Sequence, residues 1–213
     1  GIRKFFSGPE SFTPDTNTLL GEVPEIKNFF VCCGLNSIGI GSGGGVGKVT
    51  AEWLMTGHIN EDIFSYDIKR FQKFHSELGF IKKRITESLG DLYGMHWPYK
   101  QHKTSRNVKT LPYHDNLKSF GACFGVSGGY ERPMWFALDG EKSEYEYSYN
   151  YQNWFPSAEY ESNNTIKNVG LFDLTPFSKF EIKSDKAHKE LQRICTANIK
   201  DKIGKSTYTH MLN

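Results

Sequence analysis

The stretch GLNSIGIGSGGGVGKVTAEW, residues 34–53, decides how the first part of the chain is expected to fold. Seven of the fourteen residues 34–47 are glycine, and the apolar run FFVCC, residues 29–33, comes directly before them. A short continuous apolar run is typical of a strand that is buried on both faces. Residues 48–55 have apolar side chains at near-helical spacing, and Gly57 is placed to end a helix. The pattern predicts a strand, a glycine-rich turn and a helix.

Two phosphate-binding motifs can be compared with the glycine-rich stretch. The phosphate loop of kinases and ATPases requires G-x-x-x-x-G-K-[ST], but Ser42 stands at its first position and Val49 at its last. The dinucleotide fingerprint G-x-G-x-x-G is met formally from Gly39 to Gly44. Its ribose-binding acid should end a second strand about 20 residues further on, whereas residues 57–62 are polar. A nucleotide phosphate is therefore not the favoured ligand.

Two interpretations of the glycines remain open. Glycine permits positive φ angles and close packing of a helix on a sheet, so the residues could serve packing alone. Alternatively, a glycine-rich turn that leads into a helix leaves backbone N–H groups without intrahelical partners and directs the positive end of the helix dipole outward. Such a turn would bind an anion or an electron-rich carbonyl group.

Composition and spacing argue against several classes of function. The formal charges nearly cancel, at +2, and the basic residues are interspersed with acids, so no nucleic-acid-binding surface is predicted. No run of 18 apolar residues occurs, so no membrane-spanning helix is predicted. The seven histidines share no ligand spacing, and no metal site is predicted. Buried free thiols in a reducing compartment are expected at Cys32, Cys33, Cys123 and Cys195.

The rest of the sequence predicts a mixed region followed by a new α+β segment. Residues 66–79 and 81–89 are expected to be helical, and an aromatic series follows at 145–160. After about residue 166 we expect one helix, at 185–195, and short strands at 169–173, 179–182 and 207–212. The chain opens on GIRKFF without a methionine and closes on a strand-like stretch, so we expect a segment of a longer protein whose remaining chain is its partner.

A series of motifs runs in order through nearly the whole chain. They are GIR at 1–3, GPESFTPD at 8–15, GEVP at 21–24, GLNSIG at 34–39, GGGVG at 43–47, SRN at 105–107, GYERPMWF at 129–136, NWF at 153–155, DLTPFSKF at 173–180 and YTHMLN at 208–213. In these motifs the sequence resembles the family of FAD-dependent sarcosine and dimethylglycine dehydrogenases. That family also includes the non-catalytic regulatory subunit of pyruvate dehydrogenase phosphatase.

The resemblance implies a mixed α+β / α/β architecture in three parts. Residues 1–60 would be the C-terminal end of an FAD-binding, glycine-oxidase-like oxidoreductase domain. Residues 61–165 would be the central domain that links it to the next part, and residues 166–213 would begin a folate-binding aminomethyltransferase-like domain. The family's pyrophosphate site, flavin-linking histidine and most of its amine pocket lie outside these residues, so no catalytic residue is assigned.

The resemblance also implies two kinds of site residue. Cofactor-binding residues would be Gly34, Leu35, Asn36, Ser37, Ile38 and Gly39. Their backbone amides would face the pyrimidine carbonyl of FAD, where negative charge collects when the flavin accepts a hydride. Arg3 matches a segment that binds the substrate carboxylate in related amine oxidases, although a surface ion pair is an alternative. Glu131 and Arg132 could form a charged pair at a domain junction, but structural packing is favoured.

The function implied by the resemblance is that of a flavin-dependent dehydrogenase. It would demethylate an N-methyl amino acid, with sarcosine favoured and dimethylglycine next. FAD would take the hydride, tetrahydrofolate the one-carbon unit and the electron-transfer flavoprotein the electrons, in the mitochondrial matrix. Two alternatives remain: a non-catalytic regulatory or scaffold paralogue resembling the phosphatase regulatory subunit, and an assembly partner that exposes the aromatic residues 145–160.

Overall fold

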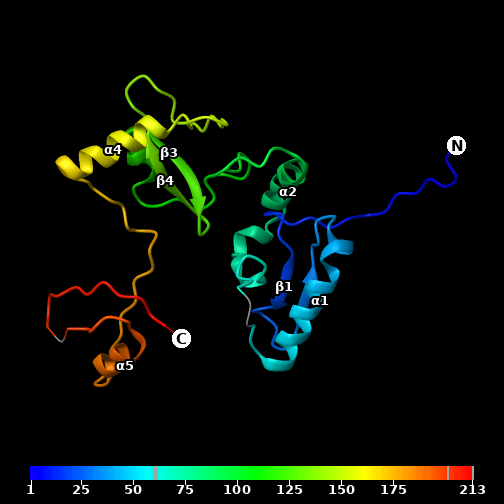
Figure 1. Ribbon diagram of the computed structural model, residues 1–213, viewed down its shortest axis with the longest axis horizontal. Helices are drawn as coiled ribbons and strands as arrows, with labels where there is room; N and C mark the ends of the chain where they lie inside the picture. Colours follow the sequence, from blue (N-terminus) through cyan, green and yellow to red (C-terminus); the bar gives the residue numbers. More distant parts are fainter. Residues whose placement is uncertain (60–61, 201, 213) are drawn as a thin grey trace. The chain divides into compact units, whose positions relative to one another are not determined.

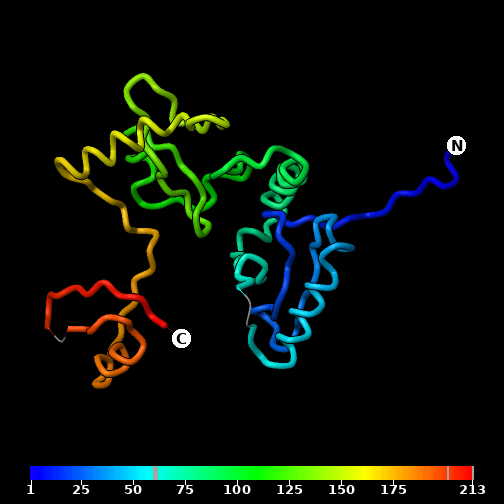
Figure 2. Tube along the Cα trace, viewed as in Figure 1, coloured from blue at the N-terminus to red at the C-terminus, as the bar shows by residue number. Residues whose placement is uncertain are grey.

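The computed structural model describes residues 1–59, 62–200 and 202–212, and the chain divides into two units, Gly1–Phe172 and Asp173–Asn213 (Figure 1). Helices and short antiparallel strands both occur, which confirms the predicted α+β / α/β class. None of the helices in the described part is long and apolar enough to cross a bilayer. The Cα trace in Figure 2 follows the chain through each unit in turn.

The first sheet is a two-stranded antiparallel pair, β1 (Leu19–Glu22) and β2 (Phe30–Cys33). The strand predicted at 29–33 is confirmed, but its predicted burial on both faces is wrong. Phe30 and Val31 are only half-buried, and the two cysteines after them are exposed. The reason is that this sheet has two strands in the described part of the chain, with α1 packed beside them (Figure 1).

The helix α1 (Gly39–Thr56) begins well before the predicted Lys48, so the predicted glycine turn is largely part of the helix. No proline or bulky β-branched run opposes helical angles there, and glycine adopts them at a modest cost per residue. The turn itself is confined to residues 34–38. Gly57 ends the helix in the left-handed conformation, as predicted, and its N–H donates to the Trp53 carbonyl at 2.9 Å.

Trp53 is the side chain that holds α1 on the hairpin. Its ring is buried and meets Phe30 edge-on, with ring centroids 5.8 Å apart. It also covers Gly21, which has a φ of +111°, and a Cβ at that position would lie 2.4 Å from the indole ring. Only glycine fits under this tryptophan without displacing it.

The single helix predicted at 66–79 is wrong. Two short 3₁₀ turns occupy the region instead, η1 (Ile68–Arg70) and η2 (Lys73–Ser76), separated by extended backbone. Local side-chain bonds stabilise the turns, because Asp67 accepts the Lys69 N–H at 2.8 Å and the His75 ring accepts the Gln72 N–H at 3.0 Å.

The helix predicted at 81–89 is confirmed as part of α2 (Leu78–Tyr93). Its buried residues, Phe80, Arg84 and Ser88, recur every four positions and therefore share one face. Two of the three are polar, so this face is held by hydrogen bonds as well as by apolar contact. The Ser88 hydroxyl, for instance, donates to the Pro14 carbonyl at 2.7 Å.

A second hairpin, which was not predicted from the sequence, follows the short helix α3 (His114–Ser119). Its strands are β3 (Ala122–Ser127) and β4 (Tyr130–Phe136), and α4 (Phe155–Lys167) packs beside β4. Gly128 and Gly129 make the turn, with φ of +58° and +82°. Two consecutive positive φ angles suit a two-residue hairpin turn, and the Gly-Gly pair was the available sequence signal.

The unit from Asp173 onward has little regular structure. The helix predicted at 185–195 is confirmed as α5 (Ala187–Ile194). The strands predicted at 169–173, 179–182 and 207–212 are wrong, apart from one isolated bridge between Cys195 and Met211. No described residue from 173 to 212 is buried, so these segments have no sheet or core to pair with.

The four cysteines are free thiols, as predicted, but the prediction that they are buried holds only for Cys123. Cys32 and Cys33 are exposed at the end of β2, and Cys195 is half-buried. Burial raises the pKa of the Cys123 thiol to about 11, so this side chain is a neutral thiol at neutral pH.

Candidate functional site

The turn between β2 and α1, residues 34–38, is fixed by the side chain of Asn36. This side chain is 1% exposed, and its Oδ1 accepts the Thr13 N–H at 2.8 Å. Its Nδ2 donates to the Gly34 carbonyl at 2.6 Å, and its backbone N–H donates to the Ser11 carbonyl at 3.2 Å. Asn36 itself has a φ of 48°, which asparagine tolerates better than most residues. It therefore ties the turn to residues 11–13.

The backbone amides at the start of α1 divide into an occupied and an open group. The Ile38 amide donates to the Leu35 carbonyl at 3.0 Å. The amides of Ser37, Gly39 and Ile40 have no acceptor within the described ranges. The N-cap residue, Ile38, provides no side-chain cap, and the first turn contains no acid. The helix start can therefore accept an electron-rich oxygen.

The glycines of this region serve two different purposes. A Cβ on Gly34 would lie 2.6 Å from Thr13 Cγ2, and one on Gly39 would lie 2.9 Å from Leu35 Cδ1, so packing explains both residues. A Cβ would meet nothing within 4 Å in the described structure at Gly41, Gly43, Gly44, Gly45 or Gly47. Packing within this chain does not explain those five. These five glycines are exposed and spread around the outward side of the helix, here named the glycine face, where a flat ring or another backbone can approach the helix closely.

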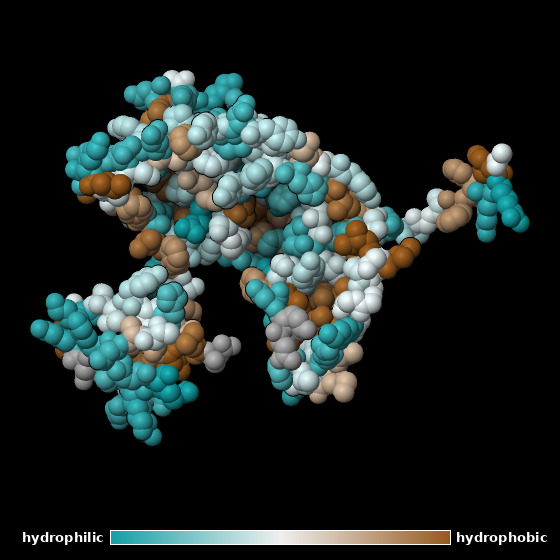
Figure 3. Space-filling model, in the orientation of Figure 1, coloured by the Kyte–Doolittle hydropathy of each residue, from teal (hydrophilic) through white to brown (hydrophobic). Residues whose placement is uncertain are grey.

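The structure keeps the six predicted cofactor residues together in one turn but does not bring Arg3 to them. Gly34 and Asn36 are buried, whereas Ser37 and Ile38 are exposed, and the Ser37 hydroxyl donates to the Glu10 carboxylate. Arg3 lies in the extended N-terminal segment, all of it exposed over residues 1–11. Hydrophobic side chains of this segment are also exposed, as the space-filling view shows (Figure 3).

A cavity of about 700 Å³ lies beside the turn. Residues 11–14, the end of β2, the 3₁₀ turns and α2 all contribute to its lining. Many lining side chains are apolar, among them Phe12, Leu19, Phe71, Ile81 and Ile85. His75 also lines it, stacked on Phe74 with centroids 4.0 Å apart, and burial lowers the pKa of this imidazole. The cavity is mainly apolar and of a size that suits a small ring system.

Among the residues that the structure describes, Glu131 is the most completely buried acid, at 2% exposure, and its partners indicate a structural role. The Arg106 guanidinium donates to both of its oxygens, at 2.8 and 2.5 Å, and the Asn107 N–H donates at 2.7 Å. Burial alone would raise the pKa of Glu131, but these bonds hold it below its usual value. Arg106 also donates to the Phe124 carbonyl at 2.9 Å. The network fixes the segment around residue 106 to the second hairpin, in agreement with the packing interpretation.

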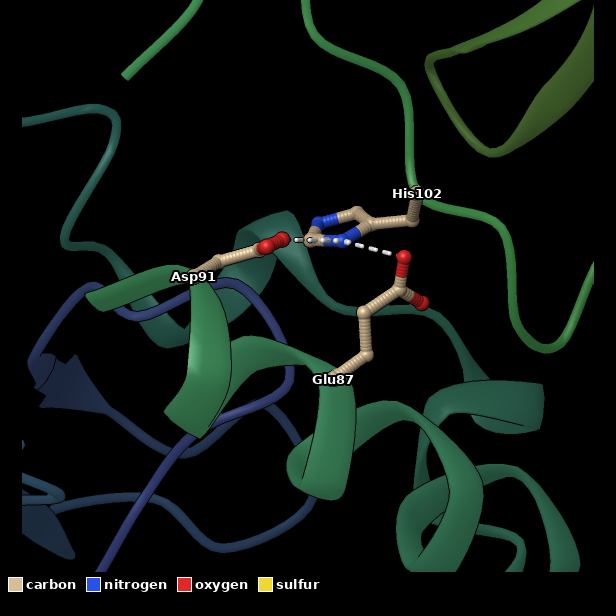
Figure 4. Close-up of side chains that lie close together, drawn as sticks. All are labelled: Glu87, Asp91 and His102. Carbon is tan, nitrogen blue, oxygen red and sulfur yellow. Dashed lines mark ion pairs between the residues drawn. The ribbon is translucent and has the colours of Figure 1, made fainter. Parts of the chain in front are cut away.

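A further cluster, absent from the sequence predictions, consists of Glu87, Asp91 and His102 (Figure 4). The two acids come from α2, and the histidine comes from the segment that follows it. His102 Nδ1 lies 3.5 Å from an Asp91 oxygen and 4.0 Å from a Glu87 oxygen. Burial, aided by the charge of Arg84, lowers the pKa of His102, so its ring is neutral at neutral pH. The available signal was an acid pair four residues apart, followed eleven residues later by a histidine.

Two family models match the chain. Residues 56–110 match the FAD dependent oxidoreductase central domain, and residues 113–213 match the GCVT N-terminal domain. Relatives that align with the whole chain include 4-methylaminobutanoate oxidase (formaldehyde-forming) of Paenarthrobacter nicotinovorans, 42% identical, the mitochondrial pyruvate dehydrogenase phosphatase regulatory subunit of Mus musculus, 33% identical, and the mitochondrial sarcosine dehydrogenase of Homo sapiens, 32% identical.

The chain spans about a quarter of the length of these relatives, between 25% and 26%. Dimethylglycine dehydrogenase of Rattus norvegicus is similar over 99% of the chain at 28% identity. The matches agree with the order of motifs quoted above and confirm the resemblance. The chain is similar to the sarcosine and dimethylglycine dehydrogenases and to the phosphatase regulatory subunit, and it carries matches to an FAD dependent oxidoreductase central domain and a GCVT N-terminal domain.

Proposed function

We propose that the protein containing this chain oxidatively demethylates an N-methyl amino acid with FAD as the hydride acceptor. The observation that carries the proposal is the uncapped start of α1, with open amides at Ser37, Gly39 and Ile40 beside a glycine face. These residues fit a flat, electron-rich ring. FAD, when bound, supplies the ring that accepts the hydride. The chain's own part is to hold a ring carbonyl with donors that Asn36 fixes in advance.

The substrate class follows from the relatives and from Arg3. We keep sarcosine as the favoured substrate and dimethylglycine as the next, and we add 4-methylaminobutanoate because the oxidase named for it is 42% identical. All three carry a carboxylate, for which an arginine is a suitable partner. We propose this role for Arg3, which is exposed in the chain. In the full natural chain, Arg3→Lys should raise KM for the preferred amine, and Lys4→Ala should not. An unchanged KM in Arg3→Lys would remove the assignment.

The donors at the helix start can be tested through the exposed Ile40. Proline is tolerated in the first turn of a helix, so Ile40→Pro deletes one open N–H while α1 is retained. Loss of one such donor typically slows a reaction by roughly 100-fold. Flavin reduction by the amine should slow by about this factor in the FAD-loaded full chain. The matched variant Ile40→Ala, which keeps the N–H, should reduce flavin at the rate of the parent. Equal rates in all three proteins would contradict the proposed donors.

The regulatory or scaffold alternative is favoured by the relative that is a phosphatase regulatory subunit, at 33% identity. Flavin content and amine turnover of the full natural chain distinguish the two proposals. Bound FAD with turnover of any of the three amines supports the dehydrogenase. A folded chain that neither retains FAD nor oxidises an amine supports the regulatory function.

The remaining parts of the proposal concern the acceptors, the domains and the location. The proposal that tetrahydrofolate accepts the one-carbon unit is supported only by the match to the GCVT N-terminal domain. Because residues 173–212 bury no described side chain, they form no enclosed site by themselves, and no folate-binding residue is assigned. The division into 1–60, 61–165 and 166–213 stays a prediction.

We also propose the electron-transfer flavoprotein as electron acceptor and the mitochondrial matrix as location, since several relatives are mitochondrial by name. Rapid oxygen uptake by the amine-reduced enzyme would argue against that acceptor.

A further inference from the structure

We propose that Glu87, Asp91 and His102 bind a divalent transition-metal ion of the zinc class. One ring nitrogen and two carboxylate oxygens offered by these residues all lie within 4.8 Å of one another. Figure 4 shows the imidazole directed between the two carboxylates. Separations of this order allow three ligands to surround one ion after small side-chain rotations.

The backbone places the three groups in advance. Glu87 and Asp91 are four residues apart on α2, so they lie one turn apart on the same face. The segment that carries His102 is bound to the same face, because the Lys103 and Thr104 N–H groups donate to the Glu87 carboxylate at 2.6 and 2.8 Å. The third ligand is therefore held next to the first two by backbone bonds.

His102 Nδ1 has the surroundings of a ligand atom that lacks its ion. It is inaccessible to solvent and has no hydrogen-bond partner in the described part of the structure. Its approach to Asp91, 3.5 Å, is too long for a good hydrogen bond. Buried polar atoms are rarely left without a partner, and an ion between these groups would provide one.

The carboxylates already have outer partners of the kind that orient metal ligands. Asp91 Oδ1 accepts Lys100 Nζ at 2.5 Å, while Asp91 Oδ2 faces the imidazole. Glu87 Oε2 accepts the Thr104 N–H, and Glu87 Oε1, which accepts the Lys103 N–H, is on the side of His102. Outer partners of this kind fix ligand orientation in metal sites.

The neighbouring charges set the expected strength and choice of metal. Arg84 lies 4.0 Å from the Glu87 carboxylate, and Lys100 lies 2.5 Å from the Asp91 carboxylate. These two cations already balance the two negative charges, so a dication would bring a net positive charge to the cluster. Binding should therefore be weaker than at a closed structural zinc site. A nitrogen ligand favours zinc over magnesium and calcium, which prefer oxygen ligands only. Three protein ligands leave a fourth position for water.

The test uses the full natural chain, stripped of metal and titrated with Zn²⁺ against a chromophoric chelator. Either His102→Ala or Asp91→Asn should weaken one saturable site by at least about tenfold. The control is His96→Ala, which removes an exposed histidine six residues away and should bind as the parent does. Three results would overturn the proposal. The parent could show no saturable zinc site, both ligand variants could retain the site, or the control could lose it to the same extent as they do.

Two further measurements separate a lost site from a lost fold. Metal-free Asp91→Asn should unfold at a temperature close to that of the metal-free parent, and only the parent should gain thermal stability when Zn²⁺ is added. X-ray absorption of the zinc-loaded parent should show one imidazole nitrogen with oxygen neighbours. Sulfur neighbours would place the ion on exposed thiols such as Cys32 and Cys33 and would overturn the assignment.

Discussion

The helices α1 and α2 are of similar length, 18 and 16 residues, but they are held in opposite ways. The glycine-rich α1 buries one side chain, Trp53, and a Cβ added at any of its open glycines would meet nothing within 4 Å. By contrast, α2 buries three residues on one face and bonds to two other segments through Arg84, Glu87 and Ser88. The comparison shows that α1 leaves most of its surface free of contacts within the chain, whereas α2 is fixed in place by buried side chains and hydrogen bonds.

The largest expected effect breaks the anchoring of α2. The Arg84 side chain is buried and donates to the Thr104 carbonyl at 2.5 Å, so Arg84→Leu leaves a half-buried acceptor without this donor. We expect the free energy of unfolding to fall by about 2–4 kcal/mol. Urea unfolding measures it, with the exposed Lys83→Leu as the matched control within about 0.5 kcal/mol of the parent. Equal effects of the two changes would mean that the hydrogen bonds of Arg84 do not anchor the helix.

An intermediate effect concerns acid stability. Burial alone would raise the pKa of Glu87, but bonds from Lys103 and Thr104 hold it below its usual value of 4.5. As the pH falls, the unfolded chain therefore takes up the proton before the folded chain does. The contribution of Glu87 to the free energy of unfolding is fully present above about pH 4.5, and it is lost as the pH falls through the lower pKa of the folded state.

Urea unfolding of Glu87→Gln between about pH 6 and pH 3 should consequently show a shallower loss of stability than the parent. The matched change in α1, Glu52→Gln, removes a half-exposed acid paired only weakly with Lys48 at 3.6 Å. Glu52→Gln should lose stability between about pH 6 and pH 3 as steeply as the parent does. Parallel curves for the parent and Glu87→Gln would contradict the anchoring role of this carboxylate.

The smallest expected effect concerns the stability of α1 when one of its open glycines is replaced. Gly45 lies in the helix with open space around it, so Gly45→Ala should stabilise the chain by about 0.5–1 kcal/mol. The same change at Gly21, beneath the Trp53 ring, should destabilise it because of steric overlap and positive φ. Thermal unfolding of the two variants gives the comparison. A loss of stability in Gly45→Ala would show that the glycine face is already in contact within the chain.

The sequence could predict the elements that local signals determine. Gly57 ends α1 because a left-handed residue suits a helix terminus, and the strand at 29–33 and the helix at 185–195 follow from their apolar patterns. The early start of α1 could not be read in the same way, since glycine is a poor helix former and suggested a turn.

Long-range contacts explain most of what was missed. Glu131 acquires its role from Arg106, 25 residues earlier, and no spacing rule connects the two. The Glu87, Asp91 and His102 cluster likewise depends on how the segment after α2 returns to that helix. In the turn, the residues could be named from the resemblance, but which amides stay open depends on the carbonyls of Ser11 and Leu35.

The Asn36 bonds also have a kinetic consequence. They join residues 13 and 36, which are 23 positions apart, so a loop must close before the turn can hold its left-handed angles. Closing a loop has an entropic cost that local contacts do not repay until it is complete. The amides at the start of α1 therefore become preorganised only once the chain has folded back on itself, and a chain newly made at the ribosome cannot present them earlier.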